Sequence, residues 1–213
     1  MVETAVVVAG GASADLALPA GCEGAFVVAA DGGGDLALAL GLHVDLAIGD
    51  FDSISAEGLV ALERAGTRIE RHETAKDATD LELALDAALA VGPRRILVVG
   101  SGGGRLDHLF SSLEVLTSSR YGGVEVEAQL GDARVHVIHD SRALEGRPGE
   151  LLSLHAVHGA AHGVVTEGLL YPLAAETLEP GSSRGVSNVF VEPEARVSLE
   201  SGVLLAIRPG GRR

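Results

Sequence analysis

Two aspartates separated by one residue are the sharpest chemical feature of the sequence. Asp50 and Asp52 lie in the stretch Gly49-Asp50-Phe51-Asp52-Ser53, directly after a strand-like run at residues 45–48. On extended backbone, side chains two residues apart point to the same side, with Cα atoms roughly 6.5–7 Å apart. Such a pair suits a divalent cation, because hard oxygens are the ligands that Mg²⁺ prefers. The alternative is a polar turn whose aspartates cap the loop.

A second acidic group surrounds Lys76, the single lysine of the chain. Asp77 and Asp80 follow it at the start of a helical pattern. Asp77 with an acid three residues later resembles a capping box, and acids favour the first turn of a helix in any case. The functional alternative is a phosphate contact or ion pair for Lys76 and a metal contact for Asp80. Both explanations hold together if Asp77 caps the helix while Asp80 faces a cation.

The third group is a glycine-rich stretch, residues 100–104, followed by Arg105 and Asp107. Glycines let the backbone approach a phosphate, and a helix N-terminus presents free N–H groups to it. Arg105 would neutralise phosphate charge, and Asp107 would hold a metal or orient a nucleophile; a flexible strand-to-helix turn is the alternative. Arg105 stands where a dinucleotide fingerprint needs its last glycine, and no G-x-x-x-x-G-K-[ST] motif of P-loop kinases occurs.

Alternating strand and helix patterns must position these three groups. Short apolar runs that suit strands buried on both faces occur at residues 5–9, 26–30, 45–48 and 96–99. Helical patterns occur at residues 34–40, 56–65, 78–91 and 106–118. This alternation predicts an α/β domain with a mostly parallel, Rossmann-like sheet. In such sheets ligands bind at the carboxyl ends of the strands, which is where Asp50 and Asp52 are expected.

The pattern changes after about residue 122. Segments that alternate with period 2 occur near residues 124–128, 134–139, 153–157, 164–169 and 196–199. No convincing helix follows, which indicates antiparallel β structure. The Gly- and Pro-bearing stretch Ser141–Glu150 is the best boundary, so we expect an α/β domain at 1–142 and a β domain at 146–213. The first two β segments after residue 122 are placed with the α/β domain.

Composition excludes several classes of function. A net charge of −14 argues against a nucleic-acid partner, because phosphate contacts need clustered Lys and Arg. The single cysteine, Cys22, rules out a disulfide framework and fits a reducing, cytoplasmic environment. The N-terminus lacks the pattern of a signal peptide, and no run of about 18 apolar residues predicts a membrane span. We therefore expect a cytoplasmic protein with no membrane partner.

Taken together and in order, these motifs resemble the thiamine pyrophosphokinase family. The resemblance covers nearly the whole chain. Its N-terminal motifs are Asp31-Gly32-Gly33, Gly49-Asp50-Phe51-Asp52-Ser53, Lys76-Asp77-x-Thr79-Asp80 and Gly103-Gly104-Arg105-x-Asp107-His108. Its C-terminal motifs are Thr166-Glu167-Gly168-Leu169-x-Tyr171-Pro172-Leu173, Ser183-Arg184-Gly185-Val186-Ser187-Asn188 and Gly202-x-Leu204-Leu205. The departures are Val186, where relatives often have Thr, and Val189-Phe190, where an acidic residue often comes first.

The resemblance implies an N-terminal α/β catalytic domain, a C-terminal β-sandwich that helps bind thiamine, and a homodimer. Each active site would join the aspartates of one subunit to the β domain of the other. The implied reaction transfers the pyrophosphoryl group of ATP to the hydroxyl of thiamine, giving thiamine pyrophosphate and AMP. Mg²⁺ is the implied cofactor, and ATP the co-substrate.

Residue roles follow from the same resemblance. Mg²⁺ would be held by Asp50, Asp52 and Asp80. Asp77 is the next candidate and would be a further catalytic acid. Arg105 would clamp the polyphosphate, and Asp107 would orient the thiamine hydroxyl. The residues expected to line the nucleotide site are Asp31, Gly32, Gly33, Lys76, Gly103, Gly104, Arg105 and His108. Those expected to contact thiamine are Tyr171, as a stacking partner for a cationic ring, and Ser187 and Asn188, as hydrogen-bonding groups for the pyrimidine.

Two other functions remain open from the sequence. One is a related pyrophosphokinase that acts on a pterin alcohol, and the other is a non-catalytic sensor of thiamine or a nucleotide. The segments Tyr171-Pro172-Leu173 and Ser187-Asn188 favour thiamine, because they lie in the expected substrate domain. A sensor would have little need to keep so many acids together.

Overall fold

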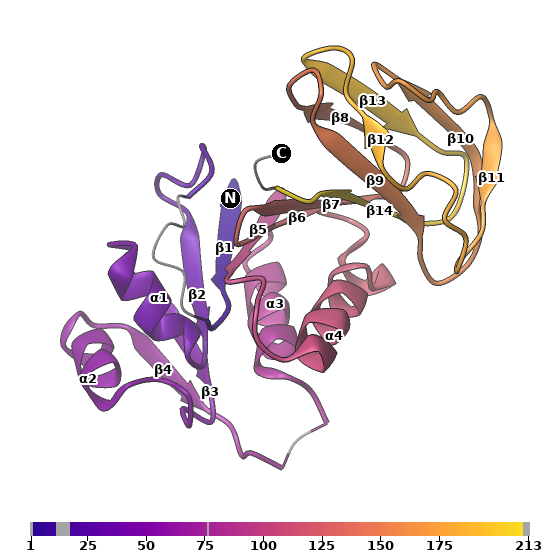
Figure 1. The fold of residues 1–213 in the computed structure, drawn as a ribbon. Helices are drawn as coiled ribbons and strands as arrows, with labels where there is room; N and C mark the ends of the chain where they lie inside the picture. The colour runs from indigo at the N-terminus through magenta and orange to yellow at the C-terminus, as the bar shows by residue number, and fades with distance from the viewer. Residues whose placement is uncertain (1, 12–17, 76, 211–213) are drawn as a thin grey trace. The chain divides into compact units, whose positions relative to one another are not determined.

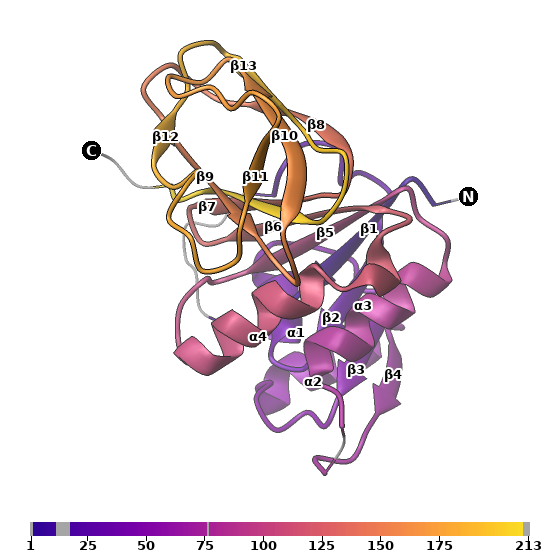
Figure 2. The same cartoon turned by 90° about the vertical axis from the view of Figure 1, so that its right-hand side faces the viewer.

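The computed structural model describes residues 2–11, 18–75 and 77–210. Contacts divide the chain into two compact units, which Figures 1 and 2 show from two directions. The first unit comprises Met1–Val115 and Gly123–Gly131, and the second comprises Leu116–Gly122 and Asp132–Arg213. Lys76, which was predicted to contact the nucleotide, lies outside the described residues.

The first unit is built on a parallel sheet. Its strands are β1 (Thr4–Val8), β2 (Phe26–Ala30), β3 (Leu46–Gly49), β4 (Arg68–Arg71), β5 (Arg95–Gly100) and β6 (Glu125–Leu130). They lie in the order β6-β5-β1-β2-β3-β4, and every neighbouring pair is parallel. The expected α/β fold with a mostly parallel sheet is confirmed. The buried strands are Val-, Ala- and Ile-rich because both of their faces are covered.

Strand β6 corrects one expectation, because its period-2 pattern was assigned to antiparallel structure. It runs parallel to β5, in a register from Arg95↔Glu125 to Gly100↔Leu130. The intervening helix α4 (Leu106–Leu116) carries the chain back, so the strand enters the sheet in the same direction as β5.

Helices cover both faces of this sheet. They are α1 (Gly33–Ala39), α2 (Ala56–Arg64), α3 (Asp80–Ala90) and α4, followed by the 3₁₀ turn η1 (Ser119–Tyr121). Figures 1 and 2 show α1 and α2 on one side of the sheet and α3 and α4 on the other. One core packs Leu36 of α1 and Leu62 of α2 against alternate strand residues such as Val6 and Val8. None of the helices in the described part of the chain has the length and apolar character that crossing a membrane requires.

Helix α3 begins later than the sequence suggested, and its cap is a different residue. Thr79 is the N-cap, and its hydroxyl oxygen accepts a hydrogen bond from the N–H of Glu82 at 3.2 Å. The expectation that Asp77 caps this helix is therefore wrong. Since Thr79 already satisfies the helix N-terminus, Asp77 is exposed ahead of the helix, and Asp80 occupies its first position.

Strand β4 was missed by the sequence reasoning, because its residues Arg-Ile-Glu-Arg are mostly charged. It lies at the edge of the sheet next to β3, where charged side chains discourage pairing with another chain. Arg68 and Glu70 lie on the same face and form an ion pair at 2.9 Å. An exposed edge strand lacks the apolar run by which buried strands are recognised.

The second unit is a β-sandwich. Its strands are β7 (Ala133–Ile138), β8 (Ser141–Glu145), β9 (Leu151–Ala156), β10 (Ala161–Glu167), β11 (Glu176–Leu178), β12 (Asn188–Val189), β13 (Glu194–Ser198) and β14 (Leu204–Arg208). Strands β12-β9-β14-β7 form one layer and β11-β10-β13-β8 the other, with antiparallel pairing in both. Buried residues of both layers, such as Leu154 and Val197, share one core.

The division between the units differs from the expected boundary at 142–146. Strand β7 pairs with β14 from Ile138↔Leu204 to Arg134↔Arg208, and the contacts of this segment place it in the second unit. The sequence placed it with the α/β unit because Gly146, Pro148 and Gly149 form the most obvious break. Those residues instead lie in the connection between β8 and β9.

A substitution at Gly33 would test how closely helix α1 packs against strand β1. A Cβ at this position would lie 1.9 Å from the carbonyl oxygen of Val8. We expect Gly33→Ala to destabilise the fold by about 1–3 kcal/mol or more, because backbone must move to relieve the overlap. Thermal unfolding should then begin several degrees lower, at about 2–4 °C per kcal/mol. Gly123→Ala, where a Cβ meets nothing within 4 Å, is the matched control and should leave the melting temperature unchanged.

Candidate functional site

Three loops meet where the direction of the sheet order reverses. Strand β2 lies on one side of β1, and β5 lies on the other side. The strand order therefore changes direction at β1, and ligands of such sheets bind at this switch point. The loop after β1 contains Gly10 and Gly11. A Cβ on Gly11 would lie 2.1 Å from Ser101 Oγ, and one on Gly10 would lie 3.5 Å from the carbonyl carbon of Gly32. The loops after β1, β2 and β5 therefore approach one another closely.

Gly10 and Gly11 were not predicted as site residues. Their signal was present in the sequence, because a glycine pair directly after a buried parallel strand is a common feature of phosphate-binding turns. They were passed over because the motifs selected from the sequence contain charged residues, and neither glycine has a charged neighbour. Their place where the three loops meet becomes visible only from the approach of Gly11 to Ser101.

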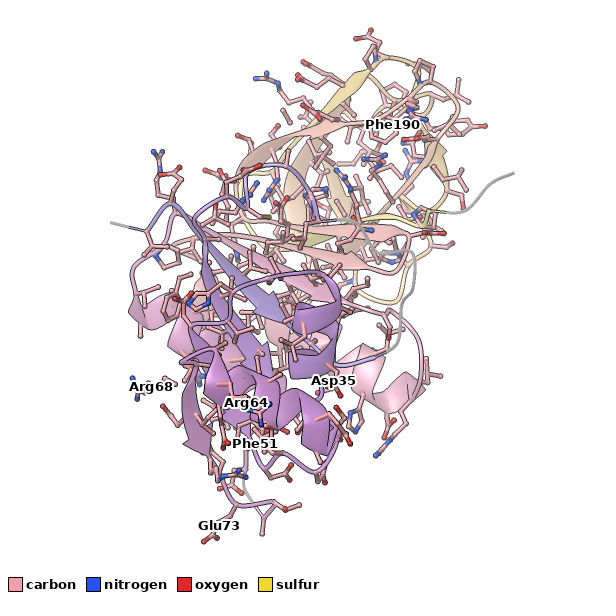
Figure 3. All side chains as sticks on the ribbon, turned by 90° about the vertical axis from the view of Figure 1, so that its left-hand side faces the viewer. Asp35, Phe51, Arg64, Arg68, Glu73 and Phe190 are labelled. Carbon is pink, nitrogen blue, oxygen red and sulfur yellow. The ribbon has the colours of Figure 1, made fainter. Side chains whose placement is uncertain are left out.

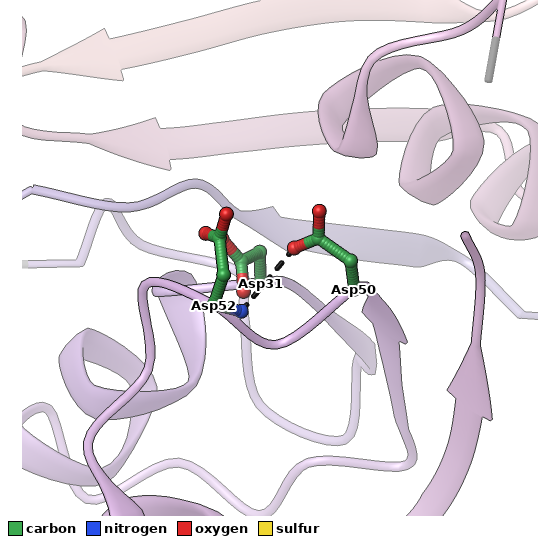
Figure 4. A group of neighbouring side chains, drawn as sticks. All are labelled: Asp31, Asp50 and Asp52. Carbon is green, nitrogen blue, oxygen red and sulfur yellow. Dashed lines mark hydrogen bonds between the residues drawn. The ribbon is translucent and has the colours of Figure 1, made fainter. Parts of the chain in front are cut away.

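Three carboxylates gather at the ends of β2 and β3. One oxygen from each of Asp31, Asp50 and Asp52 lies within 4.8 Å of the others, and Figure 4 shows the three side chains together. The N–H of Asp52 donates to Asp50 Oδ1 at 3.2 Å. Two unit charges about 4 Å apart repel by about 4 kcal/mol at an effective dielectric of 20, so the arrangement favours a cation.

Asp31 is the buried member of this group. Its backbone is in the left-handed region, with φ of 44°, and its Oδ1 accepts a hydrogen bond from the N–H of Ser53 at 3.4 Å. Burial raises the pKa of this carboxyl, the hydrogen bonds from Ser53 oppose the rise, and the charge of Asp80 adds to it. Gly49 permits this packing, since a Cβ there would lie 3.0 Å from both Asp31 Cβ and Asp80 Oδ1.

The loop that carries Asp50 and Asp52 is also anchored by a contact that involves none of the three clustered carboxylates. Asp35 of α1 accepts two hydrogen bonds from Ser55, from its N–H at 2.8 Å and from its hydroxyl at 2.7 Å. Ser55 caps helix α2 by accepting from the N–H of Gly58 at 2.9 Å. A Cβ on Gly58 would lie 1.9 Å from Asp35 Oδ1, so glycine is required for this contact.

Phe51, between the two acids, supplies a second anchor. Its φ of 62° turns the backbone into the left-handed region, and its ring lies under the guanidinium of Arg71 at 4.9 Å. Figure 3 labels Phe51 and Asp35 on this part of the molecule. Positive φ at a bulky residue is strained and persists only where surrounding contacts enforce it.

Arg105 and Asp107 form a separate pair at the start of α4. The guanidinium donates from Nη2 to Asp107 Oδ2 at 2.6 Å and from Nε to Oδ1 at 3.2 Å. This hydrogen-bonded charge lowers the pKa of Asp107 to about 2. Both side chains are exposed, and Gly104 before them has φ of 95°, which favours glycine. At neutral pH Asp107 is therefore an ionised acceptor and a very weak base.

In the second unit a hollow of about 420 Å³ is lined by Tyr171, Leu173, Ser182, Ser183, Arg184, Gly185, Val186 and Asn188. Tyr171 is 58 % exposed, whereas Asn188 is 3 % exposed. Arg184 is paired twice with Glu176, at 2.9 and 2.8 Å. Ser187 is exposed beside the hollow with φ of 57°, and its N–H donates to Ser153 Oγ at 3.0 Å.

Both units match families of known proteins. Residues 23–128 match the thiamin pyrophosphokinase catalytic domain, and residues 135–204 match the vitamin B1 binding domain of the same enzymes. The chain belongs to the thiamin pyrophosphokinase family. The thiamine pyrophosphokinase of Bacillus subtilis is 31 % identical over 170 residues, which cover 76 % of this chain and 77 % of that protein.

Solved structures of thiamin pyrophosphokinases share the fold. The Bacillus subtilis structure has a TM-score of 0.85 at 26 % identity and covers 99 % of this chain and 100 % of its own. The thiamin pyrophosphokinase of Geobacillus thermodenitrificans has a TM-score of 0.82 at 29 % identity, covering 99 % and 98 % of the two chains. Together the matches support thiamine pyrophosphokinase activity for this enzyme.

Within this family member, the predicted site residues fall into distinct groups. Of the predicted metal ligands, Asp50 and Asp52 lie in the cluster, and Asp80 lies beside its third member, Asp31, across Gly49. Asp77 is exposed and is not part of that cluster. The remaining residues group by loop: Gly32 and Gly33 with Asp31, Gly103, Gly104 and His108 with the Arg105–Asp107 pair, and Tyr171, Ser187 and Asn188 in the second unit.

The ion pair between Arg105 and Asp107 of this pyrophosphokinase should shift the titration of the Asp107 carboxyl to low pH. Because Arg105 lowers the pKa of Asp107 to about 2, the stabilising contribution of the pair should be present above pH 4 and lost as the pH falls through 2. We expect Arg105→Gln to return that pKa toward its ordinary value of 3.8, with Arg105→Lys as a control that keeps the charge. Carbon-13 NMR of the Asp107 carboxyl measures this, and equal values in wild type and Arg105→Gln would contradict the pairing.

Proposed function

We propose that this chain transfers the pyrophosphoryl group of ATP to the primary hydroxyl of thiamine, in an Mg²⁺-dependent reaction that releases AMP. One observation carries the proposal. At the carboxyl edge of the parallel sheet, one carboxylate oxygen from each of Asp31, Asp50 and Asp52 lies within 4.8 Å of the other two. Phosphoryl-type transfer depends on positioning and on neutralisation of charge, and clustered acids supply both through a cation.

The donor set fits Mg²⁺. All three groups are carboxylates, which are hard oxygen ligands, and among the described residues no softer sulfur or imidazole ligand belongs to the cluster. One oxygen from each of the three side chains lies within 4.8 Å of the others, so the cluster would supply several oxygen ligands to one cation. We assign Asp50 and Asp52 as ligands with Asp80, and Asp31 as a fourth acid of the same site. Bound Mg²⁺ would neutralise the polyphosphate and the charge that develops during transfer.

Arg105 is suited to clamp the polyphosphate without releasing Asp107. A guanidinium has five N–H donors, and the pair with Asp107 uses the Nε and one Nη2 position. The remaining donors are available for phosphate oxygens. Gly103 and Gly104 would let the backbone approach, and Gly10 and Gly11 extend this cradle on the other side of the switch point.

Tyr171 and the hollow around it are suited to thiamine. The ligand carries a permanent thiazolium charge, and an exposed aromatic ring attracts such a cation. Arg184 would repel the same charge, but its double hydrogen bond to Glu176 neutralises it. Ser187 is retained as the proposed polar group beside the pyrimidine, and Asn188 lines the same hollow.

The reaction then balances as a direct displacement. The thiamine oxygen forms a bond to the β-phosphorus, and the bond from this phosphorus to the oxygen of the α-phosphate breaks. AMP leaves with that oxygen, and the hydroxyl proton passes to solvent. Asp107, which stays ionised, would accept a hydrogen bond from the hydroxyl and orient it, with a pKa too low for it to act as an efficient base.

The proposed assembly is a cytoplasmic homodimer with composite sites, each combining the acids of one subunit with the thiamine hollow of the other. Support comes from the resemblance of the motifs to the family and, for the cytoplasm, from the single cysteine.

The first test is AMP release from ATP and thiamine, with and without Mg²⁺. We expect turnover to require both thiamine and the metal, and Asp52→Asn to reduce kcat by at least about 100-fold, because a lost ligand weakens charge neutralisation. Circular dichroism should show an unchanged fold. Glu57→Gln, an acid on the exposed surface of α2, is the control and should keep full activity. Wild-type turnover in Asp52→Asn would remove this residue from the metal site.

The second test addresses the composite site. An Asp52→Asn chain and a Tyr171→Ala/Ser187→Ala chain should each have low activity. After subunit exchange in equal amounts, we expect recovery to about a quarter of wild-type activity, because half of the dimers would contain one intact site. Tagged subunits purified in two steps would prove that mixed dimers formed. If such dimers remain as inactive as the parents, each site lies within a single chain.

A further inference from the structure

The side-chain amide of Asn188 pairs with the main chain of Tyr171. Its Oδ1 accepts the N–H of Tyr171 at 3.0 Å, and its Nδ2 donates to the carbonyl oxygen of Tyr171 at 2.7 Å. Oδ1 also accepts the N–H of Val189 at 2.9 Å. One amide thus bonds both main-chain polar groups of Tyr171, which lies 17 positions away in the chain.

Only a primary amide can make this contact. It carries a donor and an acceptor in one plane, whereas a carboxylate offers acceptors alone and a hydroxyl cannot reach both groups. The orientation of the amide follows from its surroundings, because two N–H donors face Oδ1 and a carbonyl faces Nδ2. Exchanging the two atoms would place N–H groups against N–H groups.

The pairing holds the middle of a segment whose ends are tied separately. On one side Leu170 donates its N–H to the carbonyl of Val189 at 2.8 Å. On the other side Leu173 donates its N–H to Thr166 Oγ1 at 2.8 Å. Between them stands Tyr171, and the bonds to Asn188 set the direction in which its side chain leaves the backbone.

Burial separates the roles of the two residues. Asn188 is 3 % exposed and Tyr171 is 58 % exposed, although both line the same hollow. The two bonds to Tyr171 and the one to Val189 occupy both lone pairs of Oδ1 and one of the two Nδ2 hydrogens. The amide is therefore largely committed to the protein, while the phenol ring is presented to the hollow.

We propose that Asn188 is a positioning residue, which acts on thiamine through Tyr171 rather than by a contact of its own. The proposal rests on the proposed function, which makes thiamine the ligand of this hollow. In this proposal Asn188 makes no direct hydrogen bond to the pyrimidine. It instead holds the ring of Tyr171 in position to stack on the cationic ring of thiamine. Because a ring that is already positioned loses less conformational entropy on binding, the loss of this positioning weakens thiamine affinity.

The test is a double-mutant cycle between the two positions. KM and kcat for thiamine and for ATP, and thiamine affinity by isothermal titration calorimetry, are measured for wild type, Asn188→Ala, Tyr171→Ala and the double variant. We expect each single variant to weaken thiamine affinity about tenfold, with the KM for ATP unchanged. The double variant should be no more than about twofold worse than Tyr171→Ala, because removing the platform leaves Asn188 nothing to position.

Asn188→Asp is the second variant and keeps the size of the side chain. It replaces the Nδ2 donor with an oxygen that faces the carbonyl of Tyr171, so we expect a loss of thiamine affinity at least as large as in Asn188→Ala. Thr117→Val is the matched control for stability, since Thr117 is 1 % exposed and its hydroxyl bonds to His158 at 2.8 Å. It should lower the melting temperature without changing thiamine affinity.

Additive losses in the cycle would overturn the proposal, because they would show that Asn188 acts on thiamine independently. Unchanged affinity in folded Asn188→Ala and Asn188→Asp would overturn it as well. If Tyr171→Ala binds thiamine as wild type does, the positioning role fails while the proposed activity stands. The proposed function itself fails only if the wild-type enzyme releases no AMP with thiamine.

Discussion

Repulsion among carboxylates is the constraint on which the rest of the first unit depends. Asp31, Asp50 and Asp52 would separate in a flexible chain, because like charges at these distances cost several kcal/mol. They stay together because β2 and β3 are neighbours and end side by side. Gly49, which has no side chain, leaves the space in which Asp31 and Asp80 approach each other.

The backbone around the acids is unusual as well. Asp31 and Phe51 both have positive φ, at 44° and 62°, and each such residue costs of order 1–3 kcal/mol. The anchors that offset this cost lie outside the cluster, in the bonds from Ser55 to Asp35 and in the ring of Phe51 against Arg71. A cation that relieves the repulsion would stabilise the same arrangement.

Both units hold their working loops by bonds from a side chain to the main chain. Asp35 does so for the loop of the acids, and Asn188 for the segment that carries Tyr171. In each case the residue that orients the loop is less conspicuous in the sequence than the residues it orients. Loops have no repeating ladder of backbone hydrogen bonds, so single polar side chains decide their conformation.

Much of the fold could be predicted from the chain because it depends on local patterns. The apolar run at Phe26–Ala30 and the helix ending before Gly92-Pro93 were found at or near their observed positions, since burial on two faces and helix termination leave direct marks. Strand β4 was missed because an edge strand needs no apolar run. The direction of β6 was wrong because a period of two is common to both kinds of sheet.

The sequence by itself determined which residues carry charge and in what order, and hence the family and the class of chemistry. It did not determine which of them meet. Asp31 joined the acid cluster, Asp77 stayed outside it, and Thr79 took the helix cap, because these outcomes depend on where strands end in space. Likewise, only the tertiary structure showed that the amide of Asn188 is bonded to Tyr171, since a contact across 17 residues leaves no local signal in the chain.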